Sequence, residues 1–108
     1  MKTEFIVKVS ENTTFDKNLI KGFEYMDEYI KLFKELGNDN DVNIPDTNVY
    51  YAKIYEMLKY AATLGGSIIN VEIKDGYSHF YIKFTYINDY IEFCSDLPLT
   101  MQKKVGFY

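Results

Sequence analysis

The chain contains no arginine and no tryptophan, and its 108 residues include one cysteine, one histidine and two prolines. All 12 of its basic residues are therefore lysines. Arginine is the residue best suited to bidentate contacts with phosphate and guanine, and the net charge of −4 repels phosphate, so nucleic acid is not an expected partner. Cys94 alone can form neither an internal disulfide nor a thiolate metal site, which fits a reducing compartment.

Long apolar runs are also missing. No segment approaches the ~20 apolar residues of a membrane-spanning helix. The N-terminus lacks the long apolar segment and the small-residue cleavage site of a signal peptide. We therefore expect no membrane association and a cytoplasmic location, in a cell or in an infected host. The abundance of lysine, asparagine, isoleucine, tyrosine and phenylalanine indicates an AT-rich genome, bacterial or phage, and this bias weakens the 11 tyrosines as evidence of a special aromatic surface.

The apolar fraction of 47% is that of a globular protein, and the length predicts a single domain over residues 1–108. Alternation over Glu4–Ser10 predicts a strand. A stripe of apolar residues predicts a helix from Thr13 or Thr14 to Leu36. A second helix is predicted from Pro45 to Leu64, where Gly65-Gly66 ends it.

Asp75-Gly76 is the preferred sequence of a two-residue hairpin turn, here between strands predicted at Ile68–Lys74 and Ser78–Ile87. If Lys74 pairs with Tyr77, apolar residues face apolar residues across the hairpin. The predicted pairs on this face are Val71 with Phe80 and Ile69 with Ile82, and those on the other face are Glu72 with His79 and Asn70 with Tyr81.

Residues 88–97 fit two structures. Asn88-Asp89 as a turn would pair Tyr86 with Ile91 and Phe84 with Phe93, whereas Ile87, Ile91 and Cys94 have helical spacing with Asn88 as the cap. We favour the strand. The prediction is thus an α+β fold, with a mainly antiparallel sheet of about four strands, the order β-α-α-β-β-β along the chain, and two helices on one face of the sheet.

No catalytic, metal or cofactor site is predicted. Asp39, Asp41 and Asn43 match the first ligands of a calcium loop, but Ile44 and Tyr50 stand where that loop needs glycine and glutamate. His79 beside Glu72 resembles ordinary surface polarity more than a general base. In the favoured register Cys94 lies roughly 13 Å from His79 along the sheet, too far for a thiol–imidazole dyad.

The leading hypothesis is a non-enzymatic protein that binds and inhibits another protein, a basic one in view of the net charge. Its expected binding residues are Tyr77, Tyr81 and Tyr90 on an open sheet face, which also favours a homodimer, and Asp39 and Asp41 in an acidic loop. The alternative is a small-ligand-binding protein with a pocket lined by Tyr50, Tyr55 and Tyr86. The third hypothesis is an enzyme that uses His79.

Overall fold

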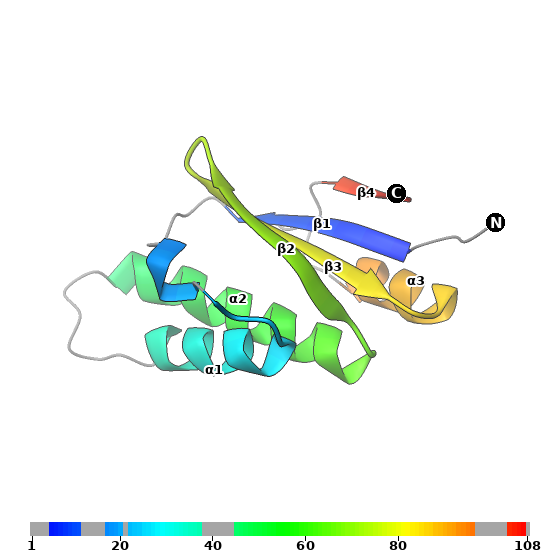
Figure 1. Cartoon of the computed structure of the whole chain (residues 1–108), viewed down its shortest axis with the longest axis horizontal. Coiled ribbons are helices and arrows are strands. Elements are labelled where there is room, and N and C mark those ends of the chain that lie inside the picture. The colour runs from blue at the N-terminus through cyan, green and yellow to red at the C-terminus, as the bar shows by residue number, and fades with distance from the viewer. Residues whose placement is uncertain (1–4, 12–16, 21, 38–44, 97–103, 108) are drawn as a thin grey trace.

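The computed structural model of the chain describes residues 5–11, 17–20, 22–37, 45–96 and 104–107. These residues form an α+β protein with an antiparallel sheet, which confirms the predicted class (Figure 1). The strands are β1 (Phe5–Glu11), β2 (Ser67–Lys74), β3 (Tyr77–Phe84) and β4 (Lys104–Phe107). The helices are the 3₁₀ turn η1 (Lys17–Ile20), α1 (Met26–Gly37), α2 (Pro45–Thr63) and α3 (Ile87–Asp96).

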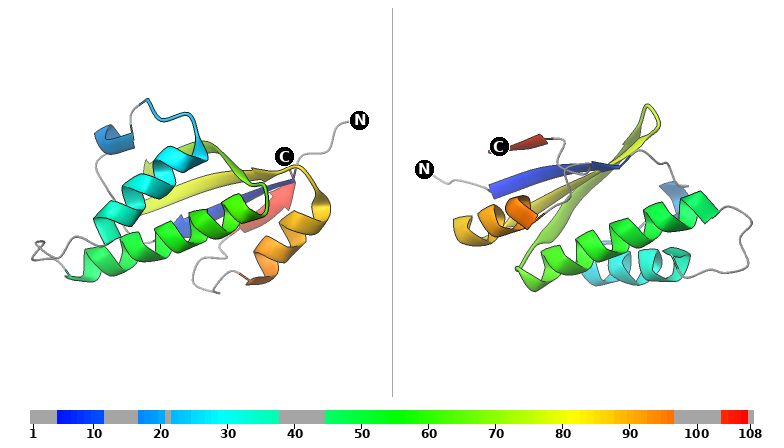
Figure 2. Two further views of the ribbon diagram at one scale, coloured as in Figure 1. Left: turned by 90° about the horizontal axis from the view of Figure 1, so that it is seen from below. Right: turned by 180° about the vertical axis from the view of Figure 1, so that it is seen from behind.

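The strands pair antiparallel in the order β2-β3-β1-β4. The connection from β1 to β2 contains η1, α1 and α2, and the connection from β3 to β4 contains α3. Each helical connection thus joins two strands that are separated in the sheet by a third strand. This is the split β-α-β arrangement, which also occurs in ferredoxin-like sheets. Figure 2 shows α1, α2 and α3 on the same face of the sheet.

Strand β3 shows how the sequence separates the two faces. Successive side chains of a strand point to opposite sides. Accordingly Phe80, Ile82 and Phe84 are buried among the helices, whereas the residues between them are half-buried. The ring of Phe80 meets Phe33 of α1 edge-on, with 5.8 Å between the ring centroids. The ring of Phe84 lies 5.0 Å from that of Phe93 of α3. The core therefore lies between the sheet and the helices.

The predicted helix from Thr13 or Thr14 to Leu36 is wrong between Lys17 and Tyr25, and its predicted start lies outside the described residues. The structure has η1, which ends at Ile20, and a separate α1, which begins at Met26. Between them Gly22 adopts a φ of 87°, a left-handed conformation that glycine tolerates and a continuous helix does not.

The second predicted helix is confirmed, since α2 covers Pro45–Thr63. Its end is the hydrogen-bonded cap expected of Gly65-Gly66. The Gly65 N–H donates to the Ala62 carbonyl at 3.0 Å, and the Gly66 N–H donates to the Ala61 carbonyl at 2.8 Å.

The Asp75-Gly76 hairpin is confirmed. Both residues have positive φ, 55° and 83°, as a type I′ turn requires. The pairs Val71–Phe80, Glu72–His79 and Asn70–Tyr81 are those predicted.

The predicted Ile69–Ile82 pair is wrong. The register shifts between Ile68 and Asn70, so Ile68 lies opposite Ile82, and Ile69 is 50% exposed. One extra residue in β2 thus forms a β-bulge, which the hydrophobic alternation alone does not reveal.

The favoured strand in residues 88–97 is wrong, because Ile87–Asp96 is α3. The Tyr90 N–H donates to the Tyr86 carbonyl at 3.2 Å in its first turn, where Asp89 also suits the helix dipole. The stripe that packs is Tyr90 and Phe93, three residues apart, rather than Ile87 and Ile91, which are about half exposed. As a helix, this segment buries Tyr90 and Phe93 against β1 and β3. The stability gained from this burial outweighs the turn propensity of Asn88-Asp89.

A hydrogen bond joins α3 to α2. The Tyr60 hydroxyl donates to Asp96 Oδ2 at 2.5 Å. Because this bond stabilises the neutral phenol, it is the main cause that raises the pKa of Tyr60 to about 12, with smaller effects from burial and from the charges of Asp96 and Glu92.

Candidate functional site

The face of the sheet opposite α1, α2 and α3 carries the side chains that alternate with the core. We call it the helix-free face, and it comprises Ile6, Lys8 and Ser10 of β1, Asn70, Glu72 and Lys74 of β2, and Tyr77, His79, Tyr81 and Lys83 of β3. Tyr77 and Tyr81 therefore lie on the face that the sequence predicts, with His79 between them. All three side chains are half-buried, so each ring is partly held and partly accessible.

Three contacts hold these rings in place. The Oγ of Ser10 and the Nδ1 of His79 are hydrogen-bonded at 2.6 Å. The rings of Tyr77 and His79 stack, with 6.1 Å between centroids and 16° between planes. The Nζ of Lys8 lies 5.6 Å from the centroid of the Tyr81 ring, in cation–π range. The row along β3 is thus ordered by side chains from β1 and from β3 itself.

Ser10, His79 and Glu72 are directly opposite one another on three adjacent strands. These residue types occur in nucleophilic triads, but a nucleophile must be reached by its substrate. Ser10 is only 4% exposed, so its hydroxyl is placed to orient the imidazole rather than to attack a substrate.

Cys94 lies in α3, on the helix side of the sheet, and His79 lies on the helix-free face. The thiol and the imidazole therefore lie on opposite sides of the sheet, because residues 87–96 form a helix and not the predicted strand. Burial raises the pKa of the Cys94 thiol, partly offset by a hydrogen bond with Tyr90.

Charge is distributed unevenly between the two sides of the molecule. The helix-free face carries Lys8, Lys74 and Lys83 against the single carboxylate of Glu72. Helix α3 carries acidic side chains, at positions 89, 92 and 96, and no lysine. The net charge of −4 therefore does not describe the helix-free face, which is locally basic.

Of the remaining predicted partner-binding residues, the structure describes Tyr90, which is not on this face. Tyr90 is 6% exposed and belongs to the core, where its ring lies 6.1 Å from that of Phe5, because α3 replaces the predicted strand. Asp39 and Asp41 lie outside the described residues.

The predicted ligand-binding residues Tyr50, Tyr55 and Tyr86 do not line the cavity described below. Tyr50 and Tyr55 are half-buried on α2, each with a lysine Nζ over its ring, at 5.6 and 5.7 Å. Tyr86 is 67% exposed just before α3.

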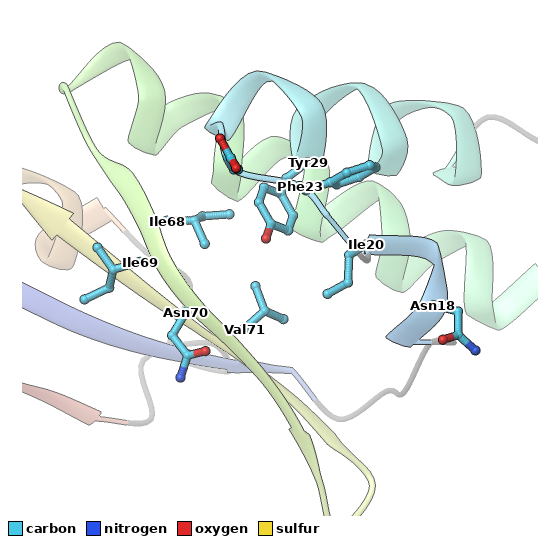
Figure 3. A pocket seen from close by; sticks show the side chains of 9 residues that line it. Asn18, Ile20, Phe23, Tyr29, Ile68, Ile69, Asn70 and Val71 are labelled. Atoms are coloured by element: carbon cyan, nitrogen blue, oxygen red, sulfur yellow. The ribbon is translucent and has the colours of Figure 1, made fainter.

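The cavity, which the sequence does not reveal, lies between β2 and the segment from η1 to α1 (Figure 3). Its volume is about 690 Å³, within the range of ligand-binding pockets, and it is partly open to solvent. It is lined by Asn18, Ile20, Phe23, Glu24, Tyr29 and residues 68–71. The Tyr29 hydroxyl points into it, and burial is the main cause that raises the pKa of this phenol.

Among the described residues, no group of three acidic, cysteine or histidine side chains is placed to hold a metal ion. No helix in the described part of the chain has the length and apolar character to cross a membrane. Comparison of the chain with protein-family models, with curated proteins and with solved structures finds no match. The geometry of the helix-free face and of the cavity is therefore the basis on which function is argued.

Proposed function

We propose that the protein is a non-enzymatic binding protein that captures another protein on its helix-free face and inhibits it by occupying the partner's surface. The observation that carries this proposal is the row of Tyr77, His79 and Tyr81, held in place along one strand. Tyrosine is enriched at interfaces because its large rigid ring loses little conformational entropy on binding. Rings that are ordered before binding reduce that cost further.

The local charge of the face indicates the chemistry of the partner. Lys8, Lys74 and Lys83 outnumber Glu72, so a surface with carboxylates beside apolar groups is complementary. A second copy of the chain would bring like charges together, and a phosphate backbone would find no arginine for bidentate contacts. An acidic protein surface, and not the basic one expected from the net charge, is thus the favoured occupant.

The contacts of the imidazole and of the thiol support a role in binding rather than catalysis. The only imidazole, that of His79, is hydrogen-bonded to buried Ser10 and stacked on Tyr77. The only thiol, that of Cys94, is on the opposite side of the sheet with its pKa raised by burial.

The test is affinity capture from cells that encode the protein, with wild type, the Tyr77→Ala/Tyr81→Ala double variant, and Tyr25→Ala as a matched control. Tyr25 is 66% exposed, just before α1. Interface tyrosines often contribute 2 kcal/mol or more, and about 1.4 kcal/mol corresponds to a tenfold change in affinity. We therefore expect the double variant to capture at least about tenfold less of the partner protein than wild type does. Tyr25→Ala should capture as much as wild type.

Equal capture by all three proteins would contradict the assignment of this face. Capture of nucleic acid, or a wild-type homodimer that only the double variant dissociates, would contradict the proposed class of partner. Circular dichroism of each variant distinguishes loss of binding from loss of fold.

A further inference from the structure

The cavity beside β2 follows the edge of the sheet. It is lined by four consecutive residues, Ile68–Val71. Because successive side chains of a strand point to opposite faces, a cavity that touches four in a row must extend along the edge of the strand. Among the described strands β2 pairs only with β3, so its other side presents backbone groups to this space.

The core is incomplete at this edge. On β3 the side chains of Phe80 and Ile82 are fully buried, whereas on β2 Ile68 and Val71, which pack against the same core, remain half-buried. The bulge leaves Ile69 50% exposed. Across the cavity the apolar side chains of Ile20, Phe23 and Tyr29 form the opposite wall (Figure 3). An apolar side chain placed here would bury surface on both walls.

An acidic side chain, that of Glu24, lines this cavity. The backbone N–H of Glu24 donates to Glu28 Oε2 at 3.0 Å, which holds the Glu28 carboxylate nearby. Asp27 and Glu28 occupy the first turn of α1. The complementary group is a lysine or arginine next to the apolar side chain.

We propose that the edge of β2 binds an extended segment of a partner protein as an added strand, with an apolar side chain of the segment in the cavity and a basic side chain beside Glu24. In this mode of recognition main-chain hydrogen bonds supply affinity and pockets for side chains supply specificity. The site differs from the helix-free face, so it is independent of the function proposed above.

The experiment measures fluorescence anisotropy of labelled peptides mixed with the full chain. The peptides have eight residues, the length of β2, with valine and threonine at most positions. A central anchor is isoleucine, leucine, phenylalanine or aspartate. The residue two positions away, on the same face of the bound strand and so able to reach Glu24, is lysine or glutamate. We expect an apolar anchor with lysine to bind at least tenfold more tightly than either the aspartate or the glutamate version.

Two further measurements locate the site. In an added strand every second N–H of the peptide points at β2. N-methylation of the residues whose N–H groups point at β2 should therefore abolish binding, whereas N-methylation of the residues between them should not. Charge reversal by Glu24→Lys should invert the preference, so that the glutamate peptide binds better, while Glu92→Lys on α3 leaves it unchanged. The Tyr77→Ala/Tyr81→Ala variant should bind these peptides as wild type does.

The proposal is overturned if no apolar-anchored peptide binds below about 1 mM, or if N-methylation has the same effect at every position. It is also overturned if a blocked single amino acid, such as N-acetyl-isoleucine methylamide, binds as tightly as the peptide, because the cavity would then be a small-ligand site.

Discussion

Replacement of Gly66 by alanine tests how the end of α2 packs against the sheet. A Cβ at this position would lie 2.9 Å from the Ala61 carbonyl oxygen, 2.9 Å from Phe84 Cε1 and 3.1 Å from Ile82 Cγ2. The Ala61 oxygen also accepts the Gly66 N–H, so a shift away from it weakens the cap of the helix. Overpacking of this kind costs about 1–3 kcal/mol.

Gly65→Ala is the matched control, because its cost has a different origin. Gly65 has a φ of 77° and no heavy atom within 4 Å of an added Cβ. Its substitution therefore costs only the left-handed backbone conformation, about 1–2 kcal/mol. Gly66 is not among the residues with positive φ, so the cost there is steric.

The assay is urea unfolding of the four combinations of each glycine variant with Phe84→Leu. Shortening Phe84 removes Phe84 Cε1, one of the two atoms nearest to the new methyl group, and leaves the Ala61 oxygen in place. We expect the cost of Gly66→Ala to fall by at least about 0.5 kcal/mol in that background, whereas the cost of Gly65→Ala stays the same. A change in midpoint at constant m-value is required for this comparison.

The outcome that would refute this reasoning is a Gly66→Ala protein as stable as wild type, or one equally destabilised in both backgrounds. Either result would mean that α2 does not approach β3 as described. That packing determines which residues of β3 face the helices. It therefore also determines that Tyr77 and Tyr81 face the opposite side of the sheet.

Three further predictions concern single contacts. Gly76→Ala should lower the free energy of unfolding by about 1 kcal/mol, because the turn needs positive φ there; unchanged stability in urea would contradict the type I′ turn. Asp96→Asn removes the charged acceptor that favours the neutral Tyr60 phenol, so the pKa of Tyr60 should fall from about 12 towards 10, seen as one tyrosine that ionises earlier in an ultraviolet titration. Ser10→Ala should cost about 1 kcal/mol and shift the ¹⁵N resonance of His79 Nδ1, and an unmoved resonance would argue against the hydrogen bond.

The sequence predicted correctly those elements that a local signal determines. Asp75-Gly76 requires two positive φ angles, and that requirement sets both the turn and most of the register of the hairpin. The stop of α2 at Gly65-Gly66 is of the same kind, because the cap forms within one turn of the helix.

The errors arose where long-range packing decides between two local patterns. Residues 87–96 fit both a strand and a helix, and the space under β1 selects the helix that buries Tyr90 and Phe93. The bulge at Ile69 lies in β2, the strand at the edge of the sheet, and the alternation of β2 by itself does not distinguish a bulged from a regular pairing. The cavity is formed by segments about 50 residues apart in sequence, near Ile20 and Val71, so no local pattern indicates it.

Site-specific photocrosslinking in cells tests the proposed binding face most directly. A benzophenone side chain is placed at position 81 on the helix-free face, or at position 25 before α1 as the control. We expect irradiation to yield a discrete crosslinked protein from position 81 and none of that product from position 25. Equal crosslinking from both positions, or a product from position 25 alone, would contradict the claim that the helix-free face is the surface that captures the partner.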